Sequence, residues 1–268
     1  MAFATVNGGT VHFADEGDGH ALVFINSLGT DFRIWDELVA PMKAHHRVLR
    51  YDKRGHGLSE MPAGAAAMGD YATDLAALMD RQRIRGATIV GLSIGGLIAQ
   101  ELIRLRPDLV ASLVLCDTAA KIGTDESWAL RIGAVERDGI DSIAENILKL
   151  WFSADFRAHR RDEFNGWRAM LTRTPKPGYV AACRALAGAD LRAAARGIRV
   201  PTLCVVGDED GSTPVALVRE LAGLIPGARF EIIAGAGHIP NLEKPEALRA
   251  LILSHLHSIV KASDVERT

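Results

Sequence analysis

The chain has 268 residues, of which 48% are hydrophobic and 24% are charged, and its formal net charge at pH 7 is −2. This composition is ordinary for a globular protein that buries a sizeable core, and the small net charge gives no reason to expect nucleic acid or an anionic membrane as a partner. The first ten residues lack the basic and apolar segments of a secretion signal, and no apolar run is long enough to span a bilayer. We therefore expect a cytoplasmic protein. Its oligomeric state stays open.

Strand-like and helix-like segments alternate through the first half of the chain. The expected elements are an edge strand at 11–14, a buried strand at 21–25, a helix at 32–44, a buried strand at 47–51, a helix at 71–82, a strand at 87–90, a helix at 96–106 and a strand at 111–116. A short low-complexity loop covers residues 63–67. Because strands that alternate with helices form parallel sheets, we predict a mostly parallel central sheet with helices on both faces.

The alternation stops after Asp117. From residue 126 to about residue 195 the pattern is helical, has no strand-like run and contains three of the four tryptophans. The elements that follow are a strand at 202–207, a helix at 214–224, a strand at 229–233 and a helix at 245–260. We predict a helical cap of residues 120–197, inserted into an α/β core of residues 1–119 and 198–268. Such a cap lies above the strand ends, where open α/β sheets bind ligands.

Three cysteines, Cys116, Cys183 and Cys204, are spread widely along the chain, and two of them lie inside apolar strand-like runs. An odd number of distant cysteines does not fit a disulfide framework or the close spacing of a metal site. We expect all three to be small buried core residues.

The segment Gly91-Leu92-Ser93-Ile94-Gly95 lies between a predicted strand and a predicted helix. A G-x-S-x-G motif in that context predicts the nucleophile elbow of an α/β-hydrolase. The turn is too tight for side chains two residues from the serine, and its strained backbone pushes the Ser93 hydroxyl into the site. The alternative is a glycine-rich turn without chemistry. A dinucleotide-binding motif does not fit, because Ser93 stands where a glycine is needed, and the chain has no P-loop Gly-Lys-Ser/Thr.

A serine hydroxyl needs a base to take its proton, and in this fold the partners follow in the order Ser, Asp/Glu, His. His238 stands on a loop of small residues between the last strand and the last helix, where the base is expected. His56 is interpreted as a loop-shaping residue. Surface or packing roles are predicted for His45, His46, His255 and His257. The candidate acids are Asp208, Glu209 and Asp210 after the strand at 202–207, and Asp117 after the strand at 111–116.

Together these features resemble the α/β-hydrolase superfamily over nearly the whole chain. The segment from Asp52 to Ser59, Asp-Lys-Arg-Gly-His-Gly-Leu-Ser, is similar to its structural D-x-R-G-x-G-x-S loop. The family pattern places the acid three residues after the glycine that ends the strand, with a proline four residues further on. Gly207, Asp210 and Pro214 fit this spacing. The resemblance therefore implies Asp210 as the acid, Asp117 as its alternative, and loop or helix-entry roles for the other two carboxylates.

Two backbone N–H groups are expected to stabilise the oxyanion. One belongs to Ile94, directly after the nucleophile. The other is expected from the loop that follows the strand at 21–25, where Leu28 holds the matching position. The direction of the backbone at Leu28 matters more than the identity of its side chain.

A closer resemblance is to bacterial 3-oxoadipate enol-lactonases of the β-ketoadipate pathway. The segments that carry it are Asn26-Ser27-Leu28-Gly29-Thr30-Asp31, Leu115-Cys116-Asp117-Thr118-Ala119-Ala120-Lys121-Ile122-Gly123, Trp151-Phe152, and Leu171-Thr172-Arg173-Thr174-Pro175 with Gly178-Tyr179. The cap matches weigh more than the elbow, because caps set the substrate. The chain departs from the pattern at three positions: Ile94 replaces an expected methionine, Asp117 an expected asparagine, and Lys53 a small residue.

This resemblance implies that Ser93 opens a carboxylated enol-lactone, 3-oxoadipate enol-lactone, through an acyl-enzyme, with His238 as base and Asp210 behind it. No metal or cofactor is required, and the expected partner is a small lactone or ester. Arg131 and Arg173 in the cap are candidates to bind the substrate carboxylate in a bidentate way. The alternative for both is a solvated helix face. Trp128 and Trp151 are candidate pocket residues, and core packing is the alternative for each.

Two other classes of function stay open. A broad carboxylesterase, a C–C hydrolase of aromatic meta-cleavage products or a perhydrolase would share the Ser-acid-His order and differ in the cap. A ligand-binding protein without turnover would share only the fold. The intact order of Ser93, Asp210 and His238 argues against the binding protein, since a binder has no need of it.

Overall fold

The computed structural model describes residues 1–61, 64 and 66–265 of the chain, and its side chains up to residue 259. Within these residues eight strands form one sheet in the order β1-β2-β4-β3-β5-β6-β7-β8. The strands are β1 (Ala2–Val6), β2 (Gly9–Glu16), β3 (Ala21–Ile25), β4 (Arg47–Tyr51), β5 (Ala87–Leu92), β6 (Val110–Cys116), β7 (Thr202–Gly207) and β8 (Arg229–Ile233). The strands β4, β3, β5, β6, β7 and β8 pair in parallel with their neighbours in this order. Strand β2 pairs antiparallel with both β1 and β4.

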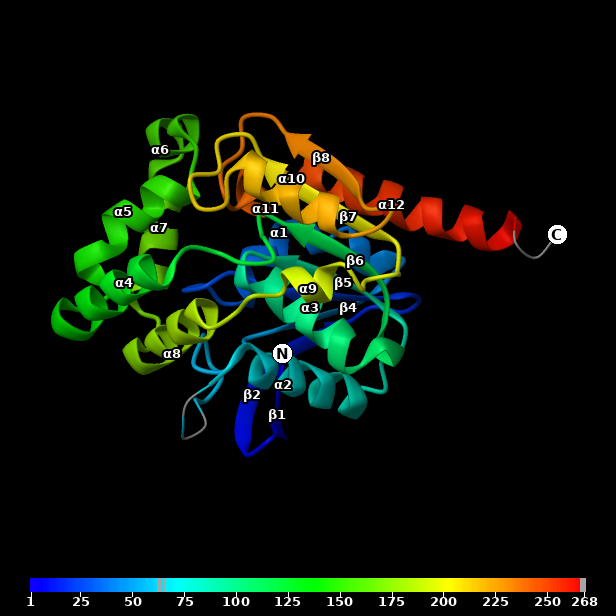
Figure 1. The fold of residues 1–268 in the computed structure, drawn as a ribbon, viewed down its shortest axis with the longest axis horizontal. Helices are drawn as coiled ribbons and strands as arrows, with labels where there is room; N and C mark the ends of the chain where they lie inside the picture. The colour runs from blue at the N-terminus through cyan, green and yellow to red at the C-terminus, as the bar shows by residue number, and fades with distance from the viewer. Residues whose placement is uncertain (62–63, 65, 266–268) are drawn as a thin grey trace.

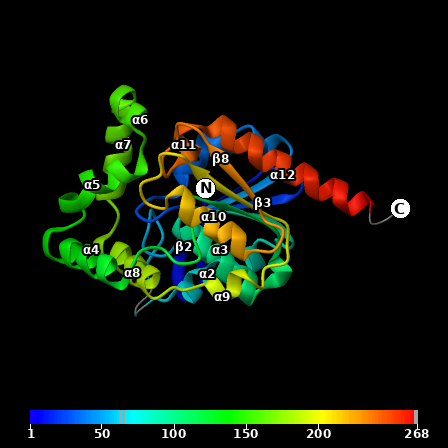
Figure 2. The same cartoon turned by 45° about the horizontal axis from the view of Figure 1, so that its top comes forward.

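Helices cover both faces of the sheet (Figures 1 and 2). On one face α1 (Asp36–Val39) packs against α11 (Pro240–Glu243) and α12 (Pro245–Val265). On the other face α2 (Met68–Arg81) packs against α3 (Ile94–Leu105), and α9 (Arg192–Ala195) contacts both α3 and α10 (Val215–Leu224). All six residues of β5 and of β7 are buried, as expected for strands covered on both faces. The predicted mostly parallel sheet between two helical layers is confirmed.

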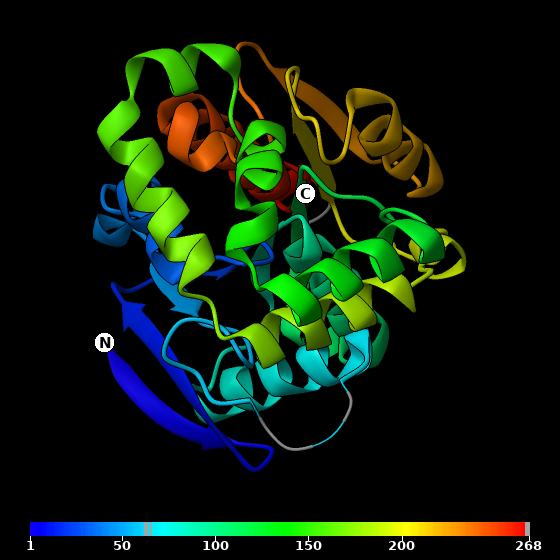
Figure 3. The same ribbon diagram turned by 90° about the vertical axis from the view of Figure 1, so that its left-hand side faces the viewer.

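Five helices between β6 and β7 form a separate layer, which lies at the left of Figure 1 and in front of the core in Figure 3. They are α4 (Asp125–Asp138), α5 (Asp141–Trp151), α6 (Ala154–His159), α7 (Arg161–Thr172) and α8 (Lys176–Ala187). Thr124 caps α4 through a hydrogen bond to the Ser127 N–H, and Ser153 caps α6 through one to the Phe156 N–H. No strand interrupts this part of the described chain, which agrees with the helical pattern expected for 126–195.

Close contacts join this helical layer to the core at several points. Gly178 on α8 lies against Gly55 so closely that a Cβ on either residue would collide with the other's backbone. Glu243 accepts hydrogen bonds from the backbone N–H and the hydroxyl of Ser153. The N–H of His238 donates to the Trp151 carbonyl at 2.8 Å. The loop that carries His238 is therefore held directly by the end of α5.

The structure corrects several predicted elements. The strand expected at 11–14 as an edge is β2, an internal strand, because β1 pairs along its outer side. The helix expected at 32–44 is broken into η1 (Phe32–Trp35), α1 and η2 (Met42–Ala44), with Pro41 at the second break. A further 3-10 turn, η3 (Pro107–Leu109), precedes β6, and α12 runs beyond the predicted end at residue 260. Residues 63 and 65 of the predicted low-complexity loop lie outside the described residues.

The three cysteines are buried and free, as expected. No helix in the described part of the chain is long and apolar enough to cross a membrane.

Candidate active site

Ser93 stands on a strained turn between β5 and α3. Its backbone lies at φ 58° and ψ −121°, outside the regions that ordinary residues prefer. A Cβ on Gly91 would collide with the carbonyl of Gly95, and a Cβ on Gly95 would collide with the carbonyl of Ile25. The two glycines of the motif are therefore required by close backbone packing. The predicted strand, sharp turn and helix are confirmed, and Ser93 lies at the N-terminus of α3.

His238 and Asp210 face each other across the ends of β8 and β7. The His238 Nδ1 lies 2.9 Å from Asp210 Oδ2. Asp210 also accepts hydrogen bonds from the N–H groups of Ser212 and Thr213 at 2.7 and 2.9 Å, and from the Thr213 hydroxyl at 2.6 Å. His238 and Asp210 are both buried. A carboxylate held by four donors in this way fixes the imidazole ring and leaves its Nε2 free for the cavity.

The charge of Asp210 is stabilised by these partners. Burial raises the pKa of the Asp210 carboxyl, but the attraction of His238 and the hydrogen bonds from His238 and Thr213 outweigh burial, so its pKa lies below the ordinary value. Asp210 is thus ionised at neutral pH, as an acid that orients a histidine must be.

Asp117, the alternative acid, lies beside this pair in a different state. It is fully buried, has a left-handed backbone with φ 45°, and accepts a hydrogen bond from the Gly207 N–H at 2.9 Å. One oxygen or nitrogen atom from each of Asp117, Asp210 and His238 lies within 4.8 Å of the others. Burial and the charge of Asp210 raise the pKa of the Asp117 carboxyl well above its ordinary value. His238 therefore faces Asp210, whose charged form is stabilised by its partners, while the charged form of the neighbouring Asp117 is disfavoured.

The two remaining carboxylates, those of Asp208 and Glu209, accept hydrogen bonds from backbone N–H groups and so stabilise nearby loops. Asp208 accepts a hydrogen bond from the Gly235 N–H at 2.7 Å, and Glu209 accepts one from the Ala154 N–H at 3.2 Å. Neither bonds to His238. His56 is fully buried, and its Nδ1 lies 3.2 Å from the Arg54 carbonyl, which matches its predicted role in shaping a loop.

The two expected oxyanion donors lie close to Ser93 along the chain or at its cavity. Leu28 lines that cavity, and Ile94 follows Ser93 directly. Among the turn, loop and cap hydrogen bonds between backbone groups of the described residues, neither the Leu28 nor the Ile94 N–H serves as a donor. We therefore expect both groups to be free to bind the oxyanion.

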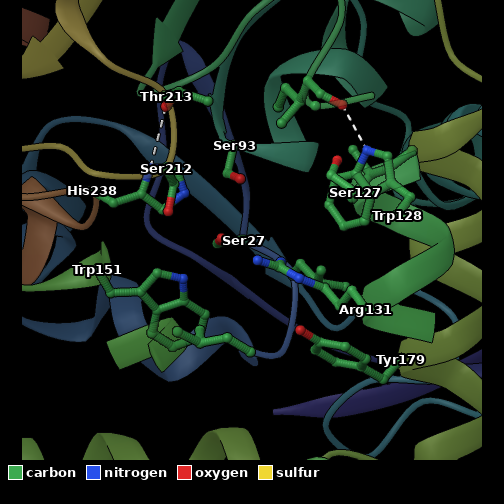
Figure 4. Close-up of a pocket in the computed structure, with 15 residues that line it drawn as sticks. Ser27, Ser93, Ser127, Trp128, Arg131, Trp151, Tyr179, Ser212, Thr213 and His238 are labelled. Atoms are coloured by element: carbon green, nitrogen blue, oxygen red, sulfur yellow. Dashed lines mark hydrogen bonds between the residues drawn. The ribbon is translucent and has the colours of Figure 1, made fainter. Parts of the chain in front are cut away.

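Ser93 and His238 line a cavity of about 190 Å³ between the core and the cap (Figure 4). The cap contributes Trp128 and Arg131 from α4, Trp151 from α5 and Tyr179 from α8. The Trp128 indole donates to the Ile122 carbonyl at 2.7 Å, and the Arg131 guanidinium lies 5.0 Å from the centre of a Trp128 ring. Both tryptophans and Arg131 thus line the cavity, and their role in substrate binding stays a prediction. The cavity is smaller than the ~300–1,000 Å³ of pockets for drug-sized ligands.

Arg173, the other candidate to bind the substrate carboxylate, is not among the residues that line this cavity, and its position fits the alternative of a solvated helix face. It is exposed and lines a second hollow of about 870 Å³, with Phe32 and Trp167. The residues close to Arg173 in the sequence explain why its side chain faces outward. Leu171 is buried and the Thr174 hydroxyl donates to the Gly29 carbonyl at 3.2 Å, so the residue between them at the end of α7 faces outward.

Two residues of the site were missed in the sequence. Tyr179 was used only as part of a resemblance, yet it forms the cavity wall beside Arg131 (Figure 4). Thr213 binds Asp210 and also lies 3.3 Å from His238 Nδ1. A threonine between the acid and Pro214 was the available signal, because such residues cap helix N-termini with their hydroxyls.

Comparison with known proteins identifies the family and supports the fold. The model of the alpha/beta hydrolase family matches residues 22–251, and the chain belongs to this family. A 3-oxoadipate enol-lactonase of Acinetobacter baylyi is 34% identical over 232 residues, which cover 87% of this chain and 86% of the relative. These matches support a hydrolase.

Solved structures of an enol-lactonase and of an esterase have the same fold as this chain. The enol-lactonase of Burkholderia xenovorans superposes with a TM-score of 0.92 at 37% identity, over 96% of this chain and 100% of that chain. A thermophilic esterase of Thermogutta terrifontis, in a malate-bound structure, superposes with a TM-score of 0.89 at 28% identity, over 96% of this chain and 97% of that chain.

Proposed function

We propose that this protein is a serine hydrolase that opens a carboxylated enol-lactone, 3-oxoadipate enol-lactone, to 3-oxoadipate in the breakdown of aromatic compounds. The observation that carries the proposal is a cationic side chain, Arg131, in the same small cavity as Ser93 and His238. Similarity to enol-lactonases of two bacteria supports it. A cytoplasmic location and a small-molecule partner remain predictions.

The proposed reaction begins when the Ser93 hydroxyl attacks the lactone carbonyl and His238 Nε2 takes its proton. Asp210 holds the imidazole in the right tautomer and stabilises the imidazolium. The tetrahedral oxyanion accepts hydrogen bonds from the Leu28 and Ile94 N–H groups. When it collapses, the ring C–O bond breaks and the enolate leaves with the proton from His238. The enol then becomes a ketone, which makes ring opening hard to reverse.

Water completes the cycle. His238 takes a proton from a water molecule, the hydroxide adds to the acyl carbonyl, and the ester bond to Ser93 breaks as His238 returns the proton. These steps use side-chain and backbone groups of the chain alone.

Arg131 is positioned to hold the second carboxylate of such a substrate. Among the described residues, no carboxylate oxygen lies within 4.0 Å of its side-chain nitrogens, in contrast to many other arginines of this chain. Its guanidinium instead lies against the ring of Trp128 and near the Tyr179 hydroxyl. Figure 4 shows its guanidinium pointing into the cavity, between Ser27 and Tyr179. An unpaired, half-buried guanidinium in a small cavity favours a ligand with a carboxylate.

A broad carboxylesterase is the second candidate, because the Thermogutta terrifontis esterase shares the fold over nearly the whole chain. The two candidates separate in one experiment. Rates are measured on the enol-lactone, on a neutral aryl ester and on an aromatic meta-cleavage product, after a fluorophosphonate probe has tested labelling at Ser93. A preference for the enol-lactone supports the proposal, and a preference for the aryl ester supports the esterase. Absence of labelling and turnover would point to a binding protein.

A further inference from the structure

Lys53 is a lysine buried directly beneath the loop that carries Leu28. It follows β4 and only 1% of its surface is exposed. Its ammonium donates to the Ser27 carbonyl at 2.6 Å and, more weakly, to the Thr30 carbonyl at 3.5 Å. Within the described residues, no carboxylate oxygen lies within the 4.0 Å of a salt bridge to this ammonium. A buried lysine held by carbonyls rather than by a carboxylate is costly for folding and invites a functional explanation.

The nearest acidic groups are committed elsewhere. Asp52 binds His12 Nδ1 at 2.8 Å and accepts the N–H groups of Phe32 and Leu58. Asp31 is paired with Arg33. Burial lowers the pKa of Lys53 to about 7, and the charges of Asp52 and Asp31 only partly oppose this effect. A negative charge that forms close to Lys53 would therefore favour its charged state.

The carbonyl that Lys53 binds belongs to the same peptide group as the Leu28 N–H. The described backbone contains no cis peptide bond, and in a trans peptide the C=O and the N–H point in opposite directions. Lys53 thus contacts the back of this peptide while the N–H points forward. The Thr30 hydroxyl donates to the same Ser27 carbonyl at 2.9 Å, and the Thr30 N–H does so at 3.4 Å. Donors on a carbonyl polarise the amide and strengthen its own N–H as a donor.

We infer that Lys53 is a positioning residue of the oxyanion hole: it orients and polarises the Ser27–Leu28 peptide, so that the Leu28 N–H binds the oxyanion more strongly than a neutral support would allow. The inference rests on the proposed function, since it requires an acyl-transfer reaction at Ser93. This inference explains why a lysine occupies position 53, where the pattern of the enol-lactonases has a small residue. The positive charge acts through one peptide group and does not touch the substrate.

The test replaces the ammonium by an apolar chain of similar length, Lys53→Met. We expect kcat/KM on an aryl ester to fall about 10- to 100-fold, less than the roughly 10²- to 10³-fold loss when an oxyanion donor itself is removed. The affinity for an arylboronic acid, which forms a tetrahedral anionic adduct with Ser93, should fall by the same factor. KM should change little. The melting temperature should stay equal or rise, because a buried charge without a carboxylate partner is removed.

Two matched variants separate positioning from structure. Thr30→Val removes a neutral donor from the same carbonyl, and should reduce boronate affinity less than Lys53→Met does. Ser59→Ala removes the hydroxyl that donates to the Asp52 carbonyl at 2.6 Å in the same loop. It should lower the melting temperature and leave boronate affinity unchanged.

Unchanged boronate affinity in Lys53→Met would overturn the inference, whatever happens to the melting temperature. If Lys53→Met does not fold, Lys53→Gln is the second variant, because it keeps a neutral donor. Its affinity for the boronate should still be lower than that of the wild type. An unchanged affinity in Lys53→Gln would overturn the role of the charge. Failure of the acyl-transfer chemistry at Ser93 shows in the wild-type protein, which would then neither bind the boronate nor react with the fluorophosphonate. Failure of the enol-lactone assignment alone shows in the substrate preference of the wild-type protein and leaves the boronate test of Lys53 intact.

Discussion

The two walls of the Ser93 cavity are built in different ways. On the core wall, Ser93, Asp210 and His238 each follow the carboxyl end of a parallel strand, namely β5, β7 and β8. Parallel strands bring their carboxyl ends to one edge of the sheet, so the sheet itself gathers these three side chains. Backbone hydrogen bonds and close glycine contacts then fix each of them.

The cap wall depends on how helices pack. Trp128 and Arg131 come from α4, Trp151 from the end of α5 and Tyr179 from α8. Which helical residues face the cavity is set by contacts such as the one between α4 and α8, and by the approach of Gly178 to the core. We therefore expect the core wall to supply the chemistry of the site and the cap wall to select the substrate. Each prediction below tests one side of this division.

Ser93→Ala carries the largest expected effect. We expect kcat to fall roughly 10³- to 10⁶-fold on the enol-lactone and on a neutral aryl ester alike, because the core wall serves both substrates. The fold should stay intact, since only a hydroxyl is removed, and circular dichroism checks this. Near wild-type turnover would contradict the role of Ser93.

Asp210→Asn should come next, with a loss of about 10⁴-fold in kcat on both substrates. An amide does not stabilise the imidazolium and favours the wrong tautomer of His238. Asp208→Asn is the matched control, because the Asp208 carboxylate accepts hydrogen bonds from the N–H groups of Gly235 and Ala236. If Asp208→Asn were the inactive variant, or if Asp117→Asn were, the assignment of the acid would be wrong.

Arg131→Ala tests the cap wall. Loss of a charge-assisted contact costs roughly 1.5–3 kcal/mol, which corresponds to about a 10- to 100-fold loss in kcat/KM on the carboxylated lactone. The neutral aryl ester never uses this contact and should react at nearly the wild-type rate. Arg173→Ala serves as the control, because Arg173 lines the other hollow. Equal losses on both substrates after Arg131→Ala would remove Arg131 from substrate binding.

The same division explains what the sequence predicts well. The strands at 21–25, 47–51, 202–207 and 229–233 have the predicted bounds, because short apolar runs between turn residues are local signals. The elbow also follows from the spacing of its glycines and serine along one turn, whereas the choice of Asp210 as partner of His238 came from the resemblance to the α/β-hydrolase superfamily. Arg131 and Arg173 were indistinguishable in the sequence, since both lie in polar helical segments. The packing of Leu171 and Thr174 against the core directs Arg173 away from the Ser93 cavity.

The sequence alone does not predict the burial and the hydrogen-bond partners of Lys53 and Asp117, for a related reason. Each looked like a simple departure from a family pattern. Their meaning depends on burial and on neighbours that come from distant segments: the Ser27 carbonyl for Lys53, and Gly207 and Asp210 for Asp117.

Asp117→Asn is expected to have the smallest effect on activity and a measurable effect on stability. Burial and the charge of Asp210 raise the pKa of the Asp117 carboxyl in the folded protein, so the fold retains its proton at pH values where the unfolded chain has lost it. This favours folding below the ordinary carboxyl pKa of about 3.9 and is lost as the pH rises toward the folded pKa.

An asparagine at this position is neutral at every pH, and its amide can accept from the Gly207 N–H and donate to Asp210. The melting temperature of Asp117→Asn should therefore exceed that of the wild type at neutral pH, and the difference should shrink as the pH falls toward 4, with kcat/KM close to wild type throughout. Thermal melts of both proteins between pH ~4 and ~8 check this. A variant that is less stable at neutral pH would show that Asp117 is ionised in the fold. The core wall would then hold two charged carboxylates behind His238, and not one anion backed by a neutral acid.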